Sequence, residues 1–394
     1  MGASVRAALE DLVLGLAGPT PRPGDLIART GLDKTIAGRI IQTIRTPDPL
    51  NALLKSPAPN GLGIFLRAAQ SAGARPDAIA SGDEAIAAFE RLLSRFPQGR
   101  AGLEAAISGW IPETREQGER AARQAAFKAM SFLLGYQSDV MLGCTVLLPS
   151  ANPSGVDVVY LSGRFGLRRL REGEPLSLFG IRYYPISGEG NSDPNPRTLD
   201  GHSIEETSCL LEEFCEPRVP RLDVVKTKDQ RLFVLPADEP ELNEPISIVL
   251  GHRTASTWQR YSTPDRPEEW QSILSRGPTR VFINDCFIHR DIYPGVEPVV
   301  TTHMVGMTML PARERGPSFK LDEVHLSLDA GWVRNDLRDI GTGEIPRYPE
   351  IVRTVFDRIG FDLRDFRTHR VRMNYPVAQI AATRWFKLPP PPQR

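Results

Sequence analysis

The feature that most constrains the fold of this chain is a pair of short helical patterns at residues 23–45, separated only by Gly31 and Leu32. In the first pattern, Leu26 and Ile27 provide an apolar face. In the second, apolar side chains recur at the i, i+3, i+4 and i+7 spacing of one helix face. These side chains are Ala37, Ile40, Ile41 and Ile44. Two helices joined by a very short turn that contains glycine are typical of a helix-turn-helix, so we expect this motif here.

If the apolar stripe of the second helix is buried, its polar residues point outward. Asp33 is a suitable N-cap for this helix. Arginine side chains match guanine and glutamine side chains match adenine in the major groove of DNA. Gly38, in the middle of this helix, lowers helix stability by on the order of 1 kcal/mol relative to alanine. One interpretation is that this glycine allows the helix to approach a DNA backbone closely. The candidate DNA-binding residues are Lys34, Thr35, Gly38, Arg39, Gln42 and Arg45.

Positive charge is concentrated around this motif. Residues 22–72 carry seven lysines and arginines against three aspartates, a local charge of +4, whereas the whole chain has a formal net charge of zero. Neutralising DNA phosphates releases condensed counterions and drives association, so such a patch favours phosphate contact. The neutral remainder of the chain argues against a protein that coats nucleic acid along its whole surface.

The run from Asp25 to Ile44 also resembles the winged helix-turn-helix of IclR-type bacterial transcription regulators. The similarity lies in Asp25-Leu-Ile-Ala, in Thr30-Gly-Leu, and in the lysine, threonine and arginine of the second helix. It covers about 50 of the 394 residues, with Asn60–Ala69 in the place of the wing. The resemblance implies that Lys34, Thr35, Arg39 and Gln42 face DNA, and we expect Arg39→Ala to weaken binding to a specific duplex. Structural helical hairpins and protein-binding winged helices share this pattern and stay open as alternatives.

The rest of the N-terminal third is predicted to be mainly helical. Apolar spacing favours a helix at Ser4–Leu16, and prolines past Thr46 favour a short strand at Leu50–Leu54 before an Asn60-Gly61 turn. Further helices are predicted at Leu62–Ala72, Ser81–Phe96 and Gly102–Tyr136.

After Gln137 the chain changes to short β-branched and aromatic runs separated by Gly, Pro and Asn, which is typical of a sheet. Predicted strands are Met141–Leu148, Val156–Leu161, Leu222–Val225, Arg231–Leu235, Ile246–Leu250, Val281–Phe287 and Val324–Leu328. Predicted helices are Ile204–Phe214, Glu268–Ser275 and Pro349–Ile359, and a polar loop is expected at Gly188–Gly201.

These patterns together predict an α+β multidomain protein. We expect a winged helix-turn-helix domain at residues 1–75, a helical linker or dimerisation region at 76–136, and a β-rich mixed sensory or oligomerisation domain at 137–394. The connector helices are candidates either for a dimer contact or for capping the sheet.

Three other clusters carry chemistry of lower specificity. Ser162–Arg171 gathers four arginines that could hold an anion or line a solvated strand edge. His289, Asp291 and His303 could bind a divalent metal, although their spacing matches no metal-site pattern. The acidic side chains of Ile204–Phe214 favour a solvated helix face over acid–base catalysis. We therefore expect no catalytic residues, metal or cofactor.

The sequence thus predicts a DNA-binding transcriptional regulator whose C-terminal domain senses a ligand or oligomerises. Expected partners are double-stranded DNA, a small-molecule effector and a second copy of the chain, because two recognition helices must reach major-groove faces about 34 Å apart. The alternatives are an enzyme with a structural helical head and a non-catalytic oligomeric scaffold. Four scattered cysteines, no signal pattern and no run of about 18 apolar residues lead us to expect a reduced, cytoplasmic protein without membrane contact.

Overall fold

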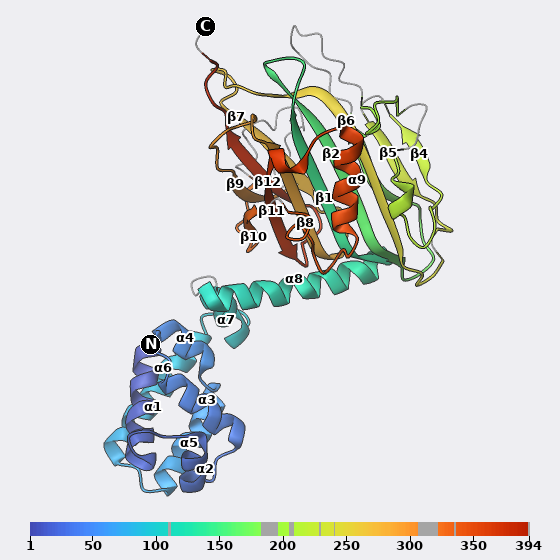
Figure 1. Ribbon diagram of the computed structural model, residues 1–394. Helices are drawn as coiled ribbons and strands as arrows, with labels where there is room; N and C mark the ends of the chain where they lie inside the picture. Colours follow the sequence, from blue (N-terminus) through green and yellow to red (C-terminus); the bar gives the residue numbers. More distant parts are fainter. Residues whose placement is uncertain are drawn as a thin grey trace. The chain divides into compact units, whose positions relative to one another are not determined.

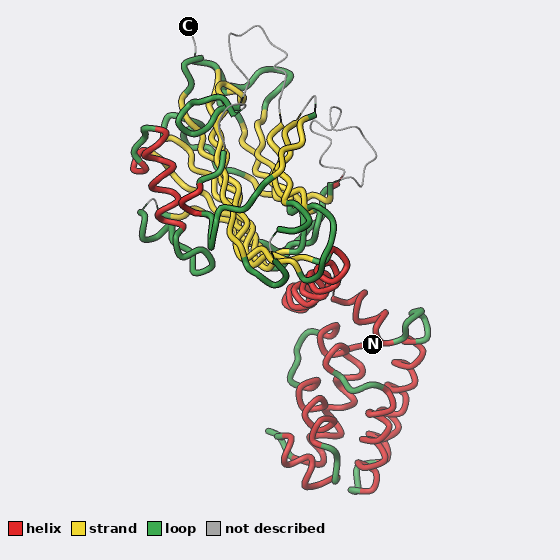
Figure 2. The backbone as a smooth tube through the Cα atoms, turned by 90° about the vertical axis from the view of Figure 1, so that its right-hand side faces the viewer, coloured by secondary structure: helices red, strands yellow, loops and turns green. Residues whose placement is uncertain are grey.

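The computed structural model describes residues 1–392 except 109–111, 183–195, 205–208, 228–229, 240, 306–321 and 335. The chain divides into two compact units, Met1–Glu119 and Arg120–Arg394. The described part of unit 1 is helical, whereas unit 2 is built mainly from strands (Figures 1 and 2). The expectation of a mixed α and β chain is therefore confirmed. Within the described ranges, no helix is both long and apolar enough to cross a membrane.

Prolines begin many of the helices of unit 1. A proline at the first helical position loses no hydrogen bond, and its fixed φ suits the helix. The helices that begin with proline are α2 (Pro23–Thr30), α4 (Pro49–Lys55), α5 (Pro59–Ser71), α6 (Pro76–Leu93) and α8 (Pro112–Leu134). The others are α1 (Gly2–Ala17), α3 (Lys34–Ile44) and α7 (Arg100–Ser108).

One apolar core holds the helices α1 to α7 together. Leu12 of α1, Leu26 of α2, Ile40 of α3, Phe65 of α5 and Phe89 of α6 are each at most 1% exposed and belong to the same cluster. The segment predicted as a linker after residue 75 therefore supplies α6 to the core of unit 1, and the boundary between the two units falls after Glu119, within the sequence of α8.

The prolines also explain two wrong predictions. The expected strand at Leu50–Leu54 lies inside α4, where the Asp48 side chain caps the helix by accepting from the Asn51 N–H at 2.7 Å. The expected Asn60-Gly61 turn lies inside α5. Pro49 and Pro59 each begin a helix. Residues 1–108 are all described and contain no strand, so the segment assigned to a wing is helical.

The described residues of unit 2 form three sheets. The largest has the order β10-β11-β8-β1-β2-β6, in which β1 and β8 are parallel and the other neighbours antiparallel. Its strands are β1 (Tyr136–Pro149), β2 (Gly155–Arg169), β6 (Ile246–Gln259), β8 (Thr279–His289), β10 (Asp329–Val333) and β11 (Phe366–Asn374). The second sheet joins β7 (Glu268–Leu274), β12 (Ile380–Lys387) and β9 (Val299–Met304). The third joins β3 (Leu176–Arg182), β5 (Gln230–Leu235) and β4 (Asp223–Lys226).

Alternation along β8 shows how the layers pack, because successive side chains of a strand point to opposite faces. Ile283 and Phe287 pack in one cluster with Val355 of α9 (Tyr348–Ile359). Cys286 packs with Phe386 of β12 in another cluster. The large sheet therefore lies between α9 and the sheet β7-β12-β9, as Figure 1 shows.

Most predicted strands and the helix at Pro349–Ile359 are confirmed, but three predictions for unit 2 are wrong. Glu268–Ser275, predicted as a helix, forms β7, because hydrogen bonding along β12 overrides its helical composition. Val324–Leu328 is irregular, and the strand begins at Asp329. Ile204–Phe214 has only a 3₁₀ turn at Glu212–Phe214, with residues 205–208 outside the described range. Most of the predicted loop at Gly188–Gly201 also lies outside it.

Candidate nucleic-acid interface

The two helices predicted at residues 23–45 are confirmed as α2 and α3. Gly31 ends α2 in the left-handed conformation, with φ 67° and ψ 17°, and its N–H donates to the Ile27 carbonyl at 2.8 Å. Glycine adopts this conformation without the steric cost that a Cβ imposes, so the chain reverses within three residues.

The first turn of α3 is held by Asp33. Its carboxylate accepts from the Thr35 N–H at 2.7 Å, and this hydrogen bond lowers the pKa of the Asp33 carboxyl. Lys34 and Thr35 follow directly and are exposed. The cap therefore fixes the end of α3 at which two of the candidate DNA-binding residues lie.

The two faces of α3 differ sharply. Ala37, Ile40 and Ile41 are at most 2% exposed in the core of unit 1. Lys34, Thr35, Gln42 and Arg45 are exposed, and Gly38 between them is half-buried. On a helix of 100° per residue these five positions fall within one arc of about 100°. We call them the α3 face.

Gly38 lies at the middle of the α3 face. A Cβ added at this position would meet no atom within 4 Å, and the residue has an ordinary helical backbone. Packing inside the protein therefore does not require a glycine here, although glycine weakens a helix by about 0.5–1 kcal/mol relative to alanine. The missing side chain leaves the α3 backbone open to an outside partner.

Arg39 lies at the border of the α3 face and turns toward α4. Its Nε donates to the Lys55 carbonyl at 3.3 Å and its Nη2 to the Leu54 carbonyl at 3.5 Å. Burial and the neighbouring charge of Arg100 lower the pKa of Arg39. The carbonyls at the end of α4 carry negative partial charge, so Arg39 stabilises that helix end. Arg45 stays exposed while its Nη2 donates to the Pro21 carbonyl at 2.9 Å.

The structure does not bring together the three candidate metal ligands His289, Asp291 and His303. His289 lies in β8 of the large sheet, and the buried His303 lies in β9 of the second sheet, 2.7 Å from the Thr301 hydroxyl. Asp291 lies near His289, with 3.6 Å between His289 Nδ1 and Asp291 Oδ2. Among the described residues, no group of three or more His, Cys, Asp and Glu side chains is arranged to hold a metal.

The four arginines of Ser162–Arg171 do not converge on one point. Arg168 pairs with Asp139 at 2.6 Å, Arg169 donates to three backbone carbonyls, and Arg171 donates to the Leu133 carbonyl. Arg164 is buried, and burial lowers its pKa to about 10. The segment up to Arg169 belongs to β2, and the structure does not gather the four guanidinium groups into an anion site.

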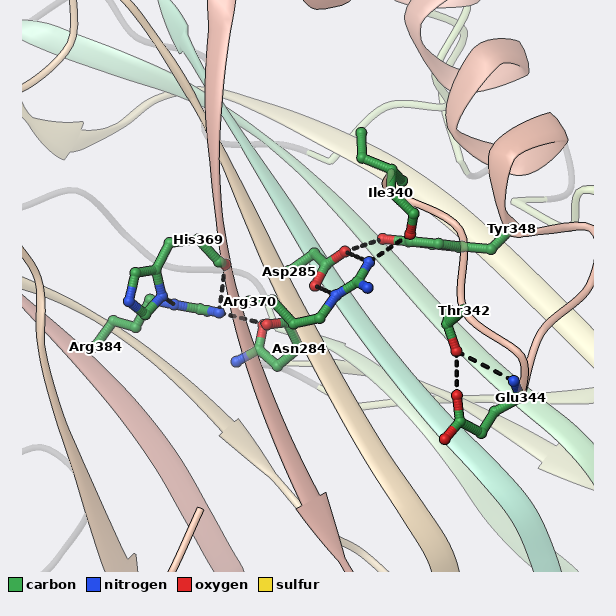
Figure 3. A network of polar contacts seen from close by, with 9 residues as sticks. All are labelled: Asn284, Asp285, Ile340, Thr342, Glu344, Tyr348, His369, Arg370 and Arg384. Carbon is green, nitrogen blue, oxygen red and sulfur yellow. Dashed lines mark hydrogen bonds and ion pairs between the residues drawn. The ribbon is translucent and has the colours of Figure 1, made fainter. Parts of the chain in front are cut away.

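Sequence reasoning missed a polar cluster in unit 2 (Figure 3). Asp285 of β8 is 0% exposed and accepts from Arg370 of β11 at 2.8 and 2.7 Å and from the Tyr348 hydroxyl of α9 at 2.7 Å. Although burial opposes it, the hydrogen bonds and charge of Asp285 raise the pKa of Arg370. Arg370 also donates to the Ile340 carbonyl at 2.7 Å. The Asp285–Arg370 pair therefore connects α9 and the segment before it to the large sheet.

A second buried cation lies on the opposite face of β8. Arg384 of β12 is 0% exposed and donates from Nε to His369 Nδ1 at 3.1 Å and from Nη2 to the His369 carbonyl at 2.8 Å. It also donates to the Gln271 side chain and to the Asn284 carbonyl. The pKa of His369 is lowered to about 4, mainly by burial and to a smaller extent by the charge of Arg384. A neutral His369 is what a hydrogen-bond acceptor for Arg384 requires.

The signal for both clusters is present in the sequence but is ambiguous. Asn284-Asp285 interrupts the apolar run of β8, and Arg370 and Arg372 alternate along β11. Charges inside an apolar run favour burial in a pair, but nothing in the sequence shows which partner each one meets.

No protein-family model and no curated protein matches this chain. Among solved structures, similarity extends to an M1 zinc metallopeptidase mutant from Deinococcus radiodurans bound to a Tyr-Ser-Ala substrate, at 10% identity and TM-score 0.25. A two-domain M1 zinc metallopeptidase mutant bound to L-tryptophan gives 10% identity and TM-score 0.24. In both comparisons 64% of this chain covers 42% of the other. The chain spans less than half the length of these structures, and a likeness at this level carries no argument about function.

Proposed function

We propose that unit 1 binds double-stranded DNA through the α3 face and that the chain is a sequence-specific transcriptional regulator. The observation that carries this proposal is the α3 face itself, a polar and basic surface with an open glycine at its centre. It is presented by the second helix of a helix-turn-helix on a segment of charge +4. Unit 2 would then supply ligand sensing or oligomerisation.

The candidate residues differ in how directly they would report on DNA binding. Lys34 suits a phosphate contact, and Gln42 has an amide that suits the adenine edge. Arg39 is engaged with the end of α4, so Arg39→Ala is expected to weaken unit 1 itself as well as any DNA contact. Lys34 and Gln42 are therefore the sharper probes of DNA binding.

The experiment selects genomic fragments on the purified full chain and then measures affinity for an enriched duplex by fluorescence anisotropy at several salt concentrations. Lys34→Ala is expected to lower the salt slope by about 1, and Gln42→Ala to weaken binding by about 5- to 100-fold and relax one base position. Arg91→Ala is the matched control, because it removes an exposed cation from α6, which packs against α1 and α5. Failure to enrich any sequence, or equal effects of all three variants, would refute the proposal.

A further inference from the structure

Arg164 of β2 is a buried cation that the fold leaves without a partner. Its side chain belongs to a residue that is 3% exposed. Among the described residues, none accepts a hydrogen bond from its guanidinium and no carboxylate pairs with it. Arg169, on the same strand and also 3% exposed, donates instead to three backbone carbonyls. Buried charges in proteins are normally paired or hydrogen-bonded, because removing an uncompensated ion from water is costly. Arg164 therefore lacks the counter-charge that a buried cation needs.

The register of the large sheet places Arg164 between the two smaller sheets. Its cross-strand neighbour on β1 is Met141, which packs against the cluster that contains Ala382 of the second sheet. Its neighbour on β6 is Ile248, which belongs to the cluster that contains Leu178 of the third sheet. Residues directly opposite one another on neighbouring strands point to the same face. Arg164 therefore lies on a face that the second sheet covers on one side and the third sheet covers on the other.

Two other polar residues lie close enough to Arg164 to act on its charge. The pKa of Arg164 is lowered to about 10, first by burial, while the phenol of Tyr136 raises it and the charge of Arg276 lowers it. The Tyr136 hydroxyl donates to the Arg276 carbonyl at 3.4 Å. Arg276 Nη1 lies 3.7 Å from the position that a Cβ would take at Gly180 of β3. A second cation and a hydroxyl group thus lie beside Arg164, which stays charged at neutral pH.

The chemistry of these groups selects the kind of ligand that fits them. A guanidinium binds carboxylates and phosphates through paired N–H donors. Burial raises the pKa of Tyr136, so its hydroxyl keeps a proton that it can donate to the same oxygens. A metal ion or a neutral apolar molecule would leave the charge of Arg164 uncompensated. The common requirement is therefore a compact oxyanion.

We propose that Arg164 binds the carboxylate or phosphate group of a small molecule, with Arg276 and the Tyr136 hydroxyl beside it. All three residues belong to unit 2, so anion binding itself does not depend on DNA. The use of this site for an effector rests on the ligand-sensing role proposed for unit 2, to which it gives a chemical class of ligand.

Thermal unfolding of the full chain without DNA tests the proposal. The probes are inorganic phosphate and acetate, each compared with chloride at the same ionic strength, and tryptophan fluorescence follows unfolding. At about tenfold above its dissociation constant, at least one of the two oxyanions is expected to raise the melting temperature by about 2–4 °C. An effect of phosphate alone assigns the site to phosphates, and an effect of acetate alone assigns it to carboxylates. No effect of either oxyanion relative to chloride would overturn the proposal.

Arg164→Met separates a binding role from a structural one. The variant is expected to lose the oxyanion effect without a lower melting temperature in chloride, because a hydrophobic side chain replaces an uncompensated buried charge. Arg169→Met is the matched control on the same strand. It is expected to lower the melting temperature, because three carbonyls lose their donor, and to retain the oxyanion effect.

Tyr136→Phe tests the site with the guanidinium in place, and it is expected to weaken oxyanion binding by about 2- to 10-fold. Lys34→Ala, on the α3 face, should bind the oxyanion like the wild type, so that failure of DNA binding and failure of this site are distinguishable. An oxyanion effect that persists in Arg164→Met would overturn the proposal. So would a loss of stability in Arg164→Met as large as in Arg169→Met, because it would assign Arg164 a structural role.

Discussion

The interiors of the two units differ in what they contain. In unit 1 the large buried side chains are apolar, such as Leu26 and Ile40, and the buried Thr43 donates to the carbonyl of Arg39 one turn away. In unit 2, Asp285 and Arg384 are both fully buried and are held by residues that lie far away in sequence. Unit 1 is thus stabilised by apolar burial and by hydrogen bonds within its helices. Unit 2 also depends on a few buried charged side chains whose hydrogen-bond partners lie far away in the sequence.

The strongest test of this difference is Asp285→Asn. The variant keeps the volume but leaves the charge of Arg370 unpaired in the interior, which costs about 3–5 kcal/mol when one partner of a buried pair is removed. Urea unfolding followed by tryptophan fluorescence measures this effect, because four of the five tryptophans lie in unit 2. The matched control is Asp238→Asn, which breaks an exposed pair with Arg221 and is expected to cost less than about 1 kcal/mol. Equal costs for both variants would contradict a special role of the buried pair.

Gly31→Ala tests how far unit 1 depends on local conformation. At φ 67° a Cβ meets no neighbour within 4 Å, so the change adds backbone strain alone, about 1–2 kcal/mol. Thermal unfolding followed by far-UV circular dichroism, which reports mainly on the helical unit, should show the loss. Gly31→Asn is the control, because asparagine tolerates the left-handed conformation better and should cost less. The interpretation is wrong if alanine and asparagine act alike.

His369 gives the pH dependence of the unit 2 interior. Its pKa falls from the ordinary value of about 6.5 to about 4 on folding, so protonation favours the unfolded chain. The contribution is complete above about pH 6.5 and is lost as the pH falls toward 4, a loss on the order of 1 kcal/mol between pH 7 and 5.

His369→Gln keeps an acceptor for Arg384 and should reduce this pH dependence. The comparison uses urea unfolding of variant and wild type at both pH values. His252, whose pKa burial also lowers to about 4, still titrates in the variant, so the pH dependence should shrink without vanishing. An unchanged pH dependence would show that His369 is not the responsible group.

Gly38→Ala has the smallest expected effect and the opposite sign. Alanine should stabilise unit 1 by about 0.5–1 kcal/mol, because nothing surrounds the new methyl group. The same variant should weaken binding to an enriched DNA duplex if the α3 backbone approaches the DNA closely. A stabilised variant with unchanged affinity would exclude close approach at this position and leave the side chains of Lys34 and Gln42 as the remaining contacts.

Much of unit 1 was predictable because its information is local. The apolar spacing of residues 23–45, Gly31 and Asp33 were sufficient to predict α2, the turn and α3. The strand at Leu50–Leu54 was wrong because proline both interrupts a helix and begins one, and a short segment does not show which role it has. The exposure of Lys34, Thr35 and Gln42 followed from the stripe alone, whereas the bond from Arg39 to the end of α4 did not.

By itself, the sequence determined the change from helices to strands near Gln137, the helix-turn-helix pattern and the polar side of α3, because each follows from residue spacing within one element. Only the tertiary structure decided the pairing of β1 with β8 and the partners of Asp285 and Arg384. The physical reason is separation along the chain. Spacing encodes which face of a helix or strand is apolar, but which distant segment covers that face is selected by the packing of the whole unit.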